Sequence, residues 1–301
     1  MEILTHTRIQ TRKNCPKADY WRNIRRLVPI QKKQSLNIGG AFHVGMETRS
    51  VEMALAYLEK QVHTFDQADV DELETAKVIV EAMVRGALET WPAFENGKRE
   101  LKFEIPIINP ETGAPSRSFR LAGKTDELVQ LDDGSWWIVE YKTASQIGQA
   151  YIDRLDLDTQ ITTYIYGLQR YLGIHISGVF YRVVRKPSIR QNKKESLEQF
   201  RRRIIEDYQT RKDFYFTELK LYRSQEDLKA FEEELWGFCQ EYLFAKRTGI
   251  HYKNTSRCTE LGGCPYMPLC RGVEGAELMY KFQAVNPELA EEGEDEQQAA
   301  S

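Results

Sequence analysis

The sequence lacks long hydrophobic runs. No stretch of its 301 residues is apolar for long enough to cross a bilayer, which excludes a membrane-spanning helix. The first ten residues also lack the apolar core of a secretory signal, so we expect a cytoplasmic protein without a membrane partner. No segment is repeated along the chain, which excludes an array of stacked repeats.

Cysteine is scarce, and the number of copies is odd: Cys15, Cys239, Cys258, Cys264 and Cys270. An odd set without a secretion signal argues against a disulfide framework, and it leaves metal binding or simple burial as roles for the thiols. Cys239 lies in an amphipathic stretch, so we expect it to be a small buried hydrophobic residue.

An excess of positive charge is also missing, because the formal net charge is −3. The acidic residues are unevenly placed, however. Residues 287–301 contain six carboxylates and no Lys or Arg, and without these six the net charge becomes +3. We expect residues 286–301 to form a disordered, solvated acidic tail. The net charge therefore does not exclude a nucleic-acid partner for the rest of the chain.

Apolar residues recur at helical spacing in some segments and at the two-residue period of strands in others. With 41% hydrophobic residues, the chain can bury a sizeable core. The expected helices cover residues 8–28, 41–62, 69–91, 158–172 and 225–247, and the expected strands cover residues 101–107, 119–131, 135–143, 178–185 and 214–222. This order predicts an α/β fold in which helices flank a mixed sheet.

One predicted hairpin brings charged residues together. Asp132-Asp133-Gly134 is a turn sequence between two expected strands. If the turn closes between residues 131 and 135, Asp126 lies directly opposite Glu140. Glu140 and Lys142 are two residues apart and share a face, so Asp126, Glu140 and Lys142 converge on one side of the sheet. The other side of the sheet takes the apolar side chains of Trp137, Val139 and Tyr141.

Two adjacent carboxylates repel each other unless a positive charge neutralises them. Mg²⁺ does so, and it is commonly held by one or two carboxylates, waters and phosphate oxygens. A metal there lowers the pKa of a bound water, and Lys142 can orient that water or stabilise the transition state. The alternative is an ordinary surface hairpin with cross-strand Lys–Glu pairs. The apolar run before Glu140 argues against it, because charges are rare in a central strand.

These segments resemble a known family. Gly123-Lys124-Thr125-Asp126, followed by Val139-Glu140-Tyr141-Lys142-Thr143, is similar to the core motif of the PD-(D/E)XK nuclease superfamily. Thr125 stands where the motif usually has proline, a departure that the superfamily often shows. The resemblance implies a restriction-endonuclease-like core, a mixed sheet flanked by helices, that hydrolyses phosphodiester bonds with Mg²⁺ or Mn²⁺.

Further segments resemble the RecB-like branch of this superfamily. Gly39-Gly40-Ala41-Phe42-His43 is similar to its N-terminal Gly-x-x-x-His motif, which implies that His43, Asp126 and Glu140 hold the metal. Gln160 and Tyr164 match its Gln-x-x-x-Tyr motif, and their spacing places both on one helix face. The resemblance implies catalytic roles for both, alongside Asp126, Glu140 and Lys142. It also assigns Glu104 to a position where the family often carries an acidic residue.

The last three cysteines occur with a C-x5-C-x5-C spacing around two glycines and two prolines, which favours a tight loop where thiolates converge. Cys264-Pro-Tyr-Met-Pro-Leu-Cys270 resembles the iron–sulfur nucleases of this superfamily, including the CRISPR-associated exonuclease and the AddB subunit. In these proteins one N-terminal and three C-terminal cysteines hold a [4Fe–4S] cluster. The resemblance implies the same for Cys15, Cys258, Cys264 and Cys270, although the first C-terminal spacing is longer than usual. Four thiolates can also hold Zn²⁺.

The resemblance implies DNA ends or single strands as the substrate, and a helicase or a protein of recombination or CRISPR adaptation as a partner. Basic residues that we expect to contact phosphates lie in residues 182–203, including Arg182, Arg201 and Arg203, and in residues 22–33. A solvated helix face is the alternative. We expect Tyr181, Tyr208 and Tyr215 to be core residues rather than platforms for unpaired bases.

The expected organisation has four regions. Residues 1–95 form a helical region with the first cluster cysteine, residues 96–250 the nuclease core, residues 251–285 the cysteine cluster, and residues 286–301 the acidic tail. Two other functions stay open. One is a non-catalytic, metal-clasped DNA-binding module derived from such a nuclease, against which the intact set of Asp126, Glu140 and Lys142 argues. The other is a redox iron–sulfur protein, for which the sequence shows no partner motif.

Overall fold

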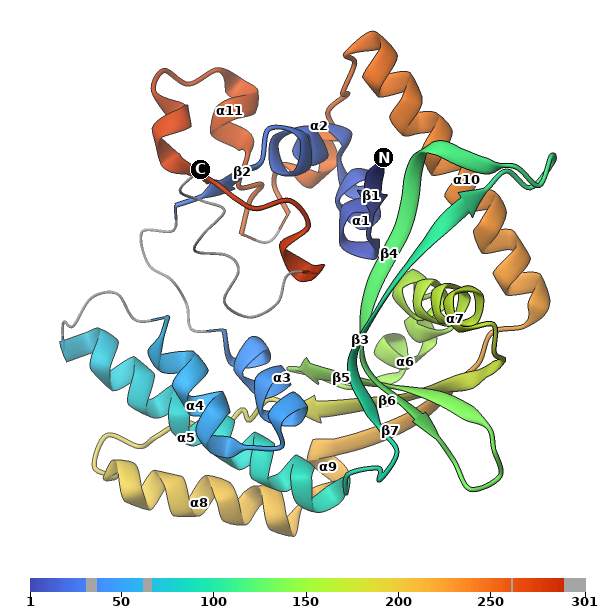
Figure 1. Ribbon diagram of the computed structural model, residues 1–301. Helices are drawn as coiled ribbons and strands as arrows, with labels where there is room; N and C mark the ends of the chain where they lie inside the picture. The colour runs from blue at the N-terminus through green and yellow to red at the C-terminus, as the bar shows by residue number, and fades with distance from the viewer. Residues whose placement is uncertain (31–36, 62–66, 261, 290–301) are drawn as a thin grey trace.

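A computed structural model describes residues 1–30, 37–61, 67–260 and 262–289. A six-stranded mixed sheet lies at the centre of the fold (Figure 1). Its strands are β1 (Glu2–Leu4), β3 (Lys98–Ile108), β4 (Pro115–Gln130), β5 (Trp136–Ala144), β6 (Ile176–Arg185) and β7 (Phe216–Leu221). This architecture confirms the α/β fold that the alternation of periods predicts.

The sheet runs in the order β1-β4-β5-β6-β7, and β3 pairs with β4 outside this path. The pairs β3–β4, β4–β5 and β6–β7 are antiparallel, whereas β1–β4 and β5–β6 are parallel. A parallel pair needs a long crossover, and here two helices connect β5 to β6. These are α6 (Gln149–Leu155) and α7 (Thr159–Leu172).

One edge of β4 is divided between two partners. β3 pairs along the other edge of this 16-residue strand. On the divided edge, β1 pairs with Phe119–Leu121, and β5 pairs with Glu127–Gln130. Between Leu121 and Glu127, none of the described strands pairs with this edge. The sheet therefore opens at Asp126, within the strand rather than at its end.

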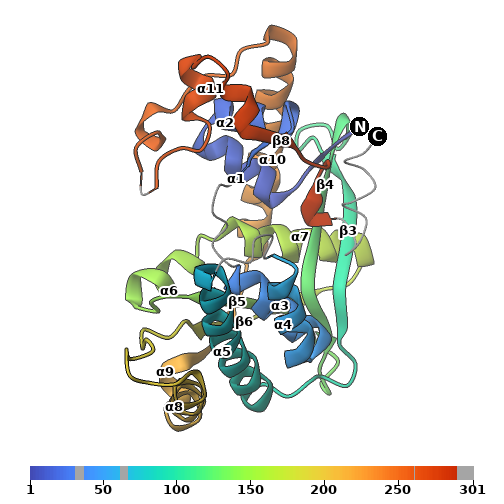
Figure 2. The ribbon, with the colours of Figure 1, turned by 90° about the vertical axis from the view of Figure 1, so that its left-hand side faces the viewer.

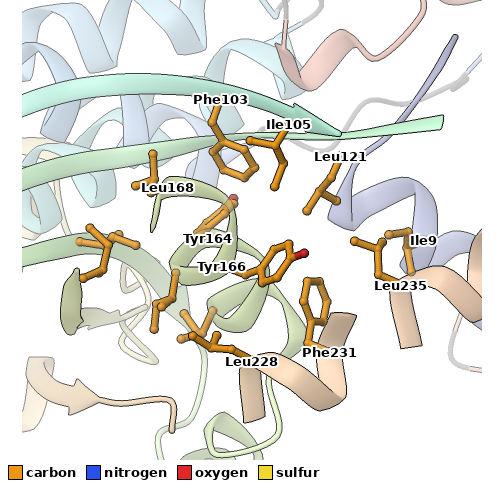
Figure 3. Close-up of a cluster of buried hydrophobic side chains, with 14 of the residues drawn as sticks. Ile9, Phe103, Ile105, Leu121, Tyr164, Tyr166, Leu168, Leu228, Phe231 and Leu235 are labelled. Carbon is orange, nitrogen blue, oxygen red and sulfur yellow. The ribbon is translucent and has the colours of Figure 1, made fainter. Parts of the chain in front are cut away.

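Helices cover both faces of the sheet (Figures 1 and 2). On one face, α6, α7, α1 (His6–Asn14) and α10 (Gln225–Thr248) pack over Phe103, Leu121 and Ile138. Figure 3 shows this core, with Tyr164 and Tyr166 from α7 between the sheet and Phe231 of α10. A β-carbon on Gly167 would lie 2.2 Å from the Phe103 ring, so the glycine lets α7 approach β3 closely.

The opposite face carries a second core. It is built by the helices α3 (Ile38–Thr48), α4 (Val51–Glu59), α5 (Gln67–Thr90), α8 (Leu197–Thr210) and α9 (Lys212–Tyr215). Trp137, Val139 and Tyr141 of β5 point into this core, whereas Ile138 points into the first one. The strand alternates as the sequence predicts, because successive side chains of a strand point to opposite faces.

A small third layer joins the two ends of the chain. β2 (Leu27–Pro29) pairs with β8 (Tyr280–Phe282), and Leu27, Tyr266 and Tyr280 form its core. The short helices here are α2 (Pro16–Asp19), the π-helical turn η1 (Tyr20–Ile24), α11 (Met267–Arg271) and the 3-10 turns η2 (Thr255–Arg257) and η3 (Ala276–Met279). A further 3-10 turn, η4 (Pro287–Leu289), lies against β4.

Several elements differ from the sequence-based expectation. Residues 8–28 are not one helix, because Pro16 starts a new one and the chain continues into a π turn and β2. The helix expected over residues 41–62 is divided at Arg49, which has a left-handed φ of 54°. β1 and α8 were not predicted. The acidic tail lies mostly outside the described residues. None of the described helices is both long and apolar enough to cross a bilayer.

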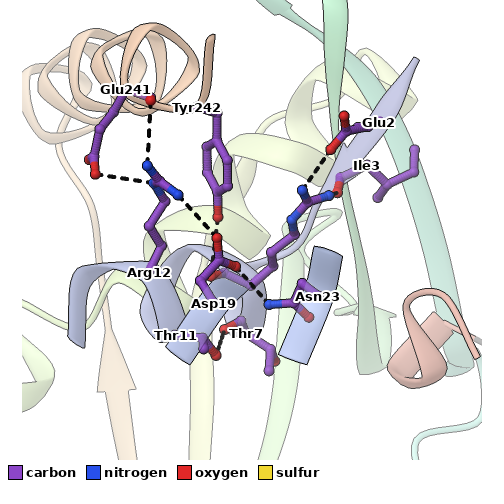
Figure 4. Close-up of polar contacts among 10 residues, drawn as sticks. Glu2, Ile3, Thr7, Thr11, Arg12, Asp19, Asn23, Glu241 and Tyr242 are labelled. Carbon is purple, nitrogen blue, oxygen red and sulfur yellow. Dashed lines mark hydrogen bonds and ion pairs between the residues drawn. The ribbon is translucent and has the colours of Figure 1, made fainter. Parts of the chain in front are cut away.

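A buried ion pair fixes the N-terminal helices to α10 (Figure 4). Arg12 is 2% exposed and lies 3.2 Å from Asp19, which is fully buried. The same guanidinium contacts Glu241 at 3.1 Å and lies over the ring of Tyr242, at 4.3 Å from its centroid. Asn23 donates a hydrogen bond to the other Asp19 oxygen. The side chain of Arg12 therefore connects α1, α2 and α10.

Replacing Arg12 with methionine leaves Asp19 charged and buried without its partner, so we expect the free energy of unfolding to fall by about 3 kcal/mol. The measurement is urea denaturation followed by circular dichroism. Lys13→Met is the control, because Lys13 is part-exposed and 3.7 Å from Glu234, and its loss costs less than about 1 kcal/mol. Equal losses for the two variants would contradict a special role for Arg12.

Candidate active site

The β4–β5 hairpin has the predicted register. Glu127 pairs with Val139 and Leu128 with Ile138, while Leu131 donates to the carbonyl of Ser135 around the turn. Gly134 has a φ of 81°, the left-handed conformation that its turn position requires. One step beyond the last recorded pair, Asp126 and Glu140 lie opposite each other on the face of the first core.

Where β4 and β5 separate, the side chain of Asp126 takes the place of a backbone carbonyl as hydrogen-bond acceptor. Its Oδ2 accepts a hydrogen bond of 2.7 Å from the backbone N–H of Tyr141. The carboxylate is thereby fixed in orientation beside Glu140. Burial raises the pKa of Asp126, but His43, Lys142 and this N–H outweigh burial and hold the pKa below its usual range. Asp126 is therefore the carboxylate that stays ionised.

Glu140 is only 1% exposed and has a different environment. Its Oε1 accepts a hydrogen bond from the ammonium group of Lys142. Its Oε2 is one of the few buried side-chain atoms in the described chain with no hydrogen-bond partner. Burial, followed by repulsion from Asp126, raises the pKa of Glu140 to about 7. Without a further cation, the two carboxylates are incompletely neutralised.

His43 approaches from α3 on the far side of β5. Asn37 caps α3 by accepting from the N–H of Gly40, and a β-carbon on Gly39 would lie 3.4 Å from Thr143 of β5. A β-carbon on Gly40 would instead lie 2.5 Å from the Asn37 side chain, so this glycine leaves room for the cap. Nδ1 of His43 lies 3.5 Å from Oδ2 of Asp126. Burial lowers the pKa of His43, but Asp126 outweighs it and the net pKa is raised.

Gln160 and Tyr164 enter the site from α7. Asp158 caps this helix by accepting from the N–H of Gln160, and Gln160 Nε2 donates to the Tyr164 hydroxyl at 2.8 Å. Tyr164 is 9% exposed. Its pKa is raised by burial and next by the negative charge of Glu140, which places the hydroxyl within electrostatic reach of that carboxylate. Tyr164 therefore lies on the side of α7 that packs against the sheet.

His6 is a neighbour of the site that no sequence motif indicates. It is the first residue of α1, directly after the capping residue Thr5. Its pKa is lowered, chiefly by burial and also by the charge of Lys142, although 136 positions separate the two residues in the sequence. The pairing of β1 with β4 places α1 beside the sheet.

Other expected positions lie elsewhere. Glu104 is exposed on the opposite face of the sheet and forms an ion pair with Arg120, so it does not belong to the site. Three of the basic residues expected to contact phosphates are held by carboxylates: Arg182 by Glu218, Arg201 by Glu81 and Arg203 by Glu195. Lys32 and Lys33 are outside the described residues. Tyr181, Tyr208 and Tyr215 are buried, as expected.

The carboxylate pair fits a divalent cation. The unpartnered Oε2 of Glu140 and the oxygens of Asp126 form a concentrated negative site beside His43. Across the described part of the chain, no three His, Cys, Asp or Glu side chains are gathered closely enough to enclose an ion by themselves. Mg²⁺ does not require such an enclosure, because it usually keeps several waters and takes one or two carboxylates.

The four cysteines named by the sequence, Cys15, Cys258, Cys264 and Cys270, line one hollow in the third layer. All four are free thiols. Trp21 Nε1 lies 3.3 Å from Sγ of Cys270, and the N–H of Asn254 lies 3.4 Å from Sγ of Cys15. Among the described residues, however, no three of these thiols are gathered closely enough to hold an ion. Cys239 is instead fully buried in α10, as expected.

Comparison with known proteins gives one extensive match. A family model described as "PD-(D/E)XK nuclease superfamily" matches residues 3–271, a range that includes the hairpin, His43, α7 and the four cysteines. No curated protein matches the chain. The similar solved structures include one described as "Crystal structure of SSO0001", with 15% identity, a TM-score of 0.25, and coverage of 68% of this chain and 85% of that one. A similarity this distant supports no argument about function.

Because Oε2 of Glu140 has no hydrogen-bond partner, metal binding at this site can be tested without an activity assay. Mn²⁺ at about a hundred times its Kd should stabilise the folded protein by about 2.7 kcal/mol, and therefore raise its melting temperature. Glu140→Gln should remove this increase while leaving the metal-free melting temperature unchanged or higher, since a buried charge is lost. Differential scanning fluorimetry measures both.

Glu127→Gln is the matched control. Glu127 is also buried, and its Oε1 has no hydrogen-bond partner. It lines a pocket with His43 and Asp126, but the alternation along β4 turns its side chain away from Glu140. This variant should keep the Mn²⁺-dependent increase. Loss of the increase in both variants, or in neither, would contradict a metal site at Glu140.

Proposed function

This chain belongs to the PD-(D/E)XK nuclease superfamily, and on that premise we propose that it is a divalent-metal-dependent deoxyribonuclease acting on DNA ends or single strands. The observation that supports this most strongly is the pair of carboxylates at the split edge of β4, one held by a backbone N–H and the other left with an unpartnered oxygen. Lys142 lies beside them.

The reaction is hydrolysis of a phosphodiester bond. The oxygen of a water forms a bond to phosphorus, one P–O bond breaks, and the products are a phosphate monoester and a free hydroxyl. A divalent cation held by Asp126 and Glu140, with His43 beside it, would supply charge neutralisation and lower the pKa of a water. Asp126 suits this role because its pKa is low, so it binds a cation without first losing a proton.

Lys142 supplies a fixed positive charge. Burial lowers the pKa of Lys142, but the negative charges of Glu140 and Asp126 outweigh burial and raise the pKa overall, so the ammonium stays protonated. A preorganised charge of this kind stabilises the negative charge that develops on the phosphoryl oxygens in the transition state. In this proposal Gln160 and Tyr164 flank the site from α7, and the hydrogen bond between them fixes both side chains. Tyr164 stays neutral because burial raises its pKa.

The choice of an exonuclease rests on the RecB-like motifs. His43 of the first motif forms an ion pair with Asp126, and Gln160 and Tyr164 of the second are joined by a hydrogen bond, which supports this branch of the superfamily. Under this proposal the partner is a helicase or a protein of recombination or CRISPR adaptation. The regions 1–95, 96–250, 251–285 and 286–301 keep the roles assigned from the sequence.

We further propose that Cys15, Cys258, Cys264 and Cys270 hold a [4Fe–4S] cluster, with Zn²⁺ as the alternative ion. Support comes from the shared hollow and from the two N–H groups aimed at sulfur. The bound group would connect residue 15 with residues 258–270, and closing such a long loop stabilises a fold. Its role in this proposal is structural.

Replacing Lys142 with alanine should reduce cleavage of end-labelled DNA by at least about a hundredfold, because a charge aimed at the transition state is lost. Binding of the same DNA in EDTA should be unchanged. The measurement is a gel assay with single- and double-stranded substrates in Mg²⁺, Mn²⁺ or EDTA. Cleavage that persists in EDTA, or in the variant, would remove the assignment.

Lys220→Ala is the control for this experiment. Lys220 lies on the opposite face of the sheet, over the rings of Trp137 and Phe180, and should leave cleavage unchanged. If the wild-type protein binds DNA but never cleaves it in any metal, the non-catalytic DNA-binding module replaces the nuclease proposal.

For the cysteines, we expect the protein purified without oxygen to be brown and to contain iron and sulfide. Cys15→Ser should lose most of this iron and lower the melting temperature, because the loop between the chain ends is no longer closed. Cys239→Ala, which changes a cysteine outside the hollow, should keep its iron. Stoichiometric zinc in a colourless protein would replace the iron–sulfur assignment.

A further inference from the structure

A second cavity, of about 440 Å³, lies outside the carboxylate site. It is formed where β1, α1, the π turn and α10 meet the segment after β8. Figure 4 shows part of its wall, with Glu2 and Ile3 of β1 on one side and Asn23 and Tyr242 nearby. The hydrolysis proposed above uses none of these residues.

The cavity is positively charged. Arg8, Arg26 and Lys246 line it, and Glu2 is the only carboxylate among the described lining residues. Glu2 is shared, because both Arg8 and Lys246 form ion pairs with it. Arg26 is exposed and makes no ion pair within the described chain. One carboxylate therefore faces three permanent cations.

Two buried nitrogens in this wall lack a partner. In the part of the chain that the structure describes, Nε of Arg8 and Nδ1 of His251 have no hydrogen-bond partner. The other nitrogens of Arg8 are used, one by the carbonyl of Ile3 at 2.9 Å and one by Glu2 at 2.6 Å. Both nitrogens are inaccessible to solvent, so they lie behind the cavity surface, and Arg8 contributes to the cavity through its positive charge.

The rest of the wall is apolar and partly open. Ile24 is 42% exposed and Val285 is 61% exposed at the cavity, beside Ile3 and Ala245. Cations next to exposed apolar side chains match a ligand that carries a phosphate and a flat, weakly polar base. We infer that this cavity binds one nucleotide unit, with its phosphate at Arg8, Arg26 and Lys246 and its base against Ile24 and Val285.

The cavity lies further along the sheet than the carboxylate site, because Glu2 on its wall pairs with Phe119 of β4. Asp126 is seven residues beyond Phe119 on the same strand, a span of about 23 Å at about 3.3 Å per residue. A single DNA strand of a few nucleotides spans this distance. The inference rests on the proposed function in taking DNA as the substrate, and it assigns a contact point for the strand away from the scissile bond.

The test compares two double variants in EDTA, where no cleavage occurs. Arg26→Gln with Lys246→Gln removes two cations from the cavity. Arg25→Gln with Arg247→Gln removes their exposed neighbours in the sequence, which do not line it. Fluorescence anisotropy measures the Kd of a labelled oligothymidylate over a series of salt concentrations, and thermal denaturation checks that both variants remain folded.

We expect the cavity variant to bind about tenfold more weakly than wild type. The slope of log K against log salt should become smaller by about 1.4, because each lost phosphate contact on a single strand contributes about 0.7. The control variant should change neither quantity by as much. Equal behaviour of the two double variants would overturn the inference.

Competition distinguishes the two sources of a nucleotide phosphate. Thymidine 5′-monophosphate and inorganic phosphate are titrated against the labelled strand. A strand contact predicts that the monophosphate competes only weakly and that the oligonucleotide depends on Arg26 and Lys246. A cavity for a free nucleotide predicts calorimetric binding of the monophosphate that the cavity variant loses. If the cavity variant binds both the oligonucleotide and the monophosphate as wild type does, the inference fails. Failure of the nuclease proposal has a different result: DNA binding that depends on the cavity, but no cleavage.

Discussion

The hydrogen bond from the backbone N–H of Tyr141 to the carboxylate of Asp126 determines how this site is built. An N–H in a central strand normally binds the carbonyl of the neighbouring strand. Here the neighbouring strand has begun to diverge toward β1, and a side chain takes the place of its carbonyl. The same contact satisfies a backbone donor and fixes one carboxylate at the point where the pairing of β4 with β5 ends.

This arrangement explains why two carboxylates with the same chemistry behave differently. Asp126 has an N–H and His43 beside it, and its pKa is low. Glu140 has Lys142 on one oxygen, nothing on the other, and a pKa of about 7. A pair with incomplete neutralisation is costly in the folded protein alone, and a cation removes that cost. The proposed divalent cation would supply the positive charge that this pair lacks.

The two ends of the chain support this centre from outside. β1 pairs with Phe119–Leu121 of β4 and so places α1 beside the sheet. Arg12 then holds α1 to Asp19 and to Glu241 of α10. The cationic cavity arises at the same junction, where β1, α1 and α10 meet the C-terminal segment. Segments distant in the sequence thus determine what surrounds the β4–β5 hairpin.

The sequence by itself determined the local part of this protein. The turn at residues 132–134 and the two-residue period of β4 and β5 were enough to predict the register, the shared face of Asp126, Glu140 and Lys142, and the α/β fold, because these depend on neighbours in the chain. The helix carrying Gln160 and Tyr164, and its end at Gly173, followed from the same kind of local pattern. The match of a family model over residues 3–271 is consistent with those motifs.

Only the tertiary structure decided the rest. The sequence did not show that β1 joins the sheet, that Arg182, Arg201 and Arg203 are held by carboxylates, or that Glu104 lies on the wrong face for the site. These facts depend on contacts between residues far apart in the chain, for which no short-range period exists. The burial of Glu140, and which charges lie beside it, likewise depend on residues packed around it from distant parts of the chain, so the sequence alone does not show them.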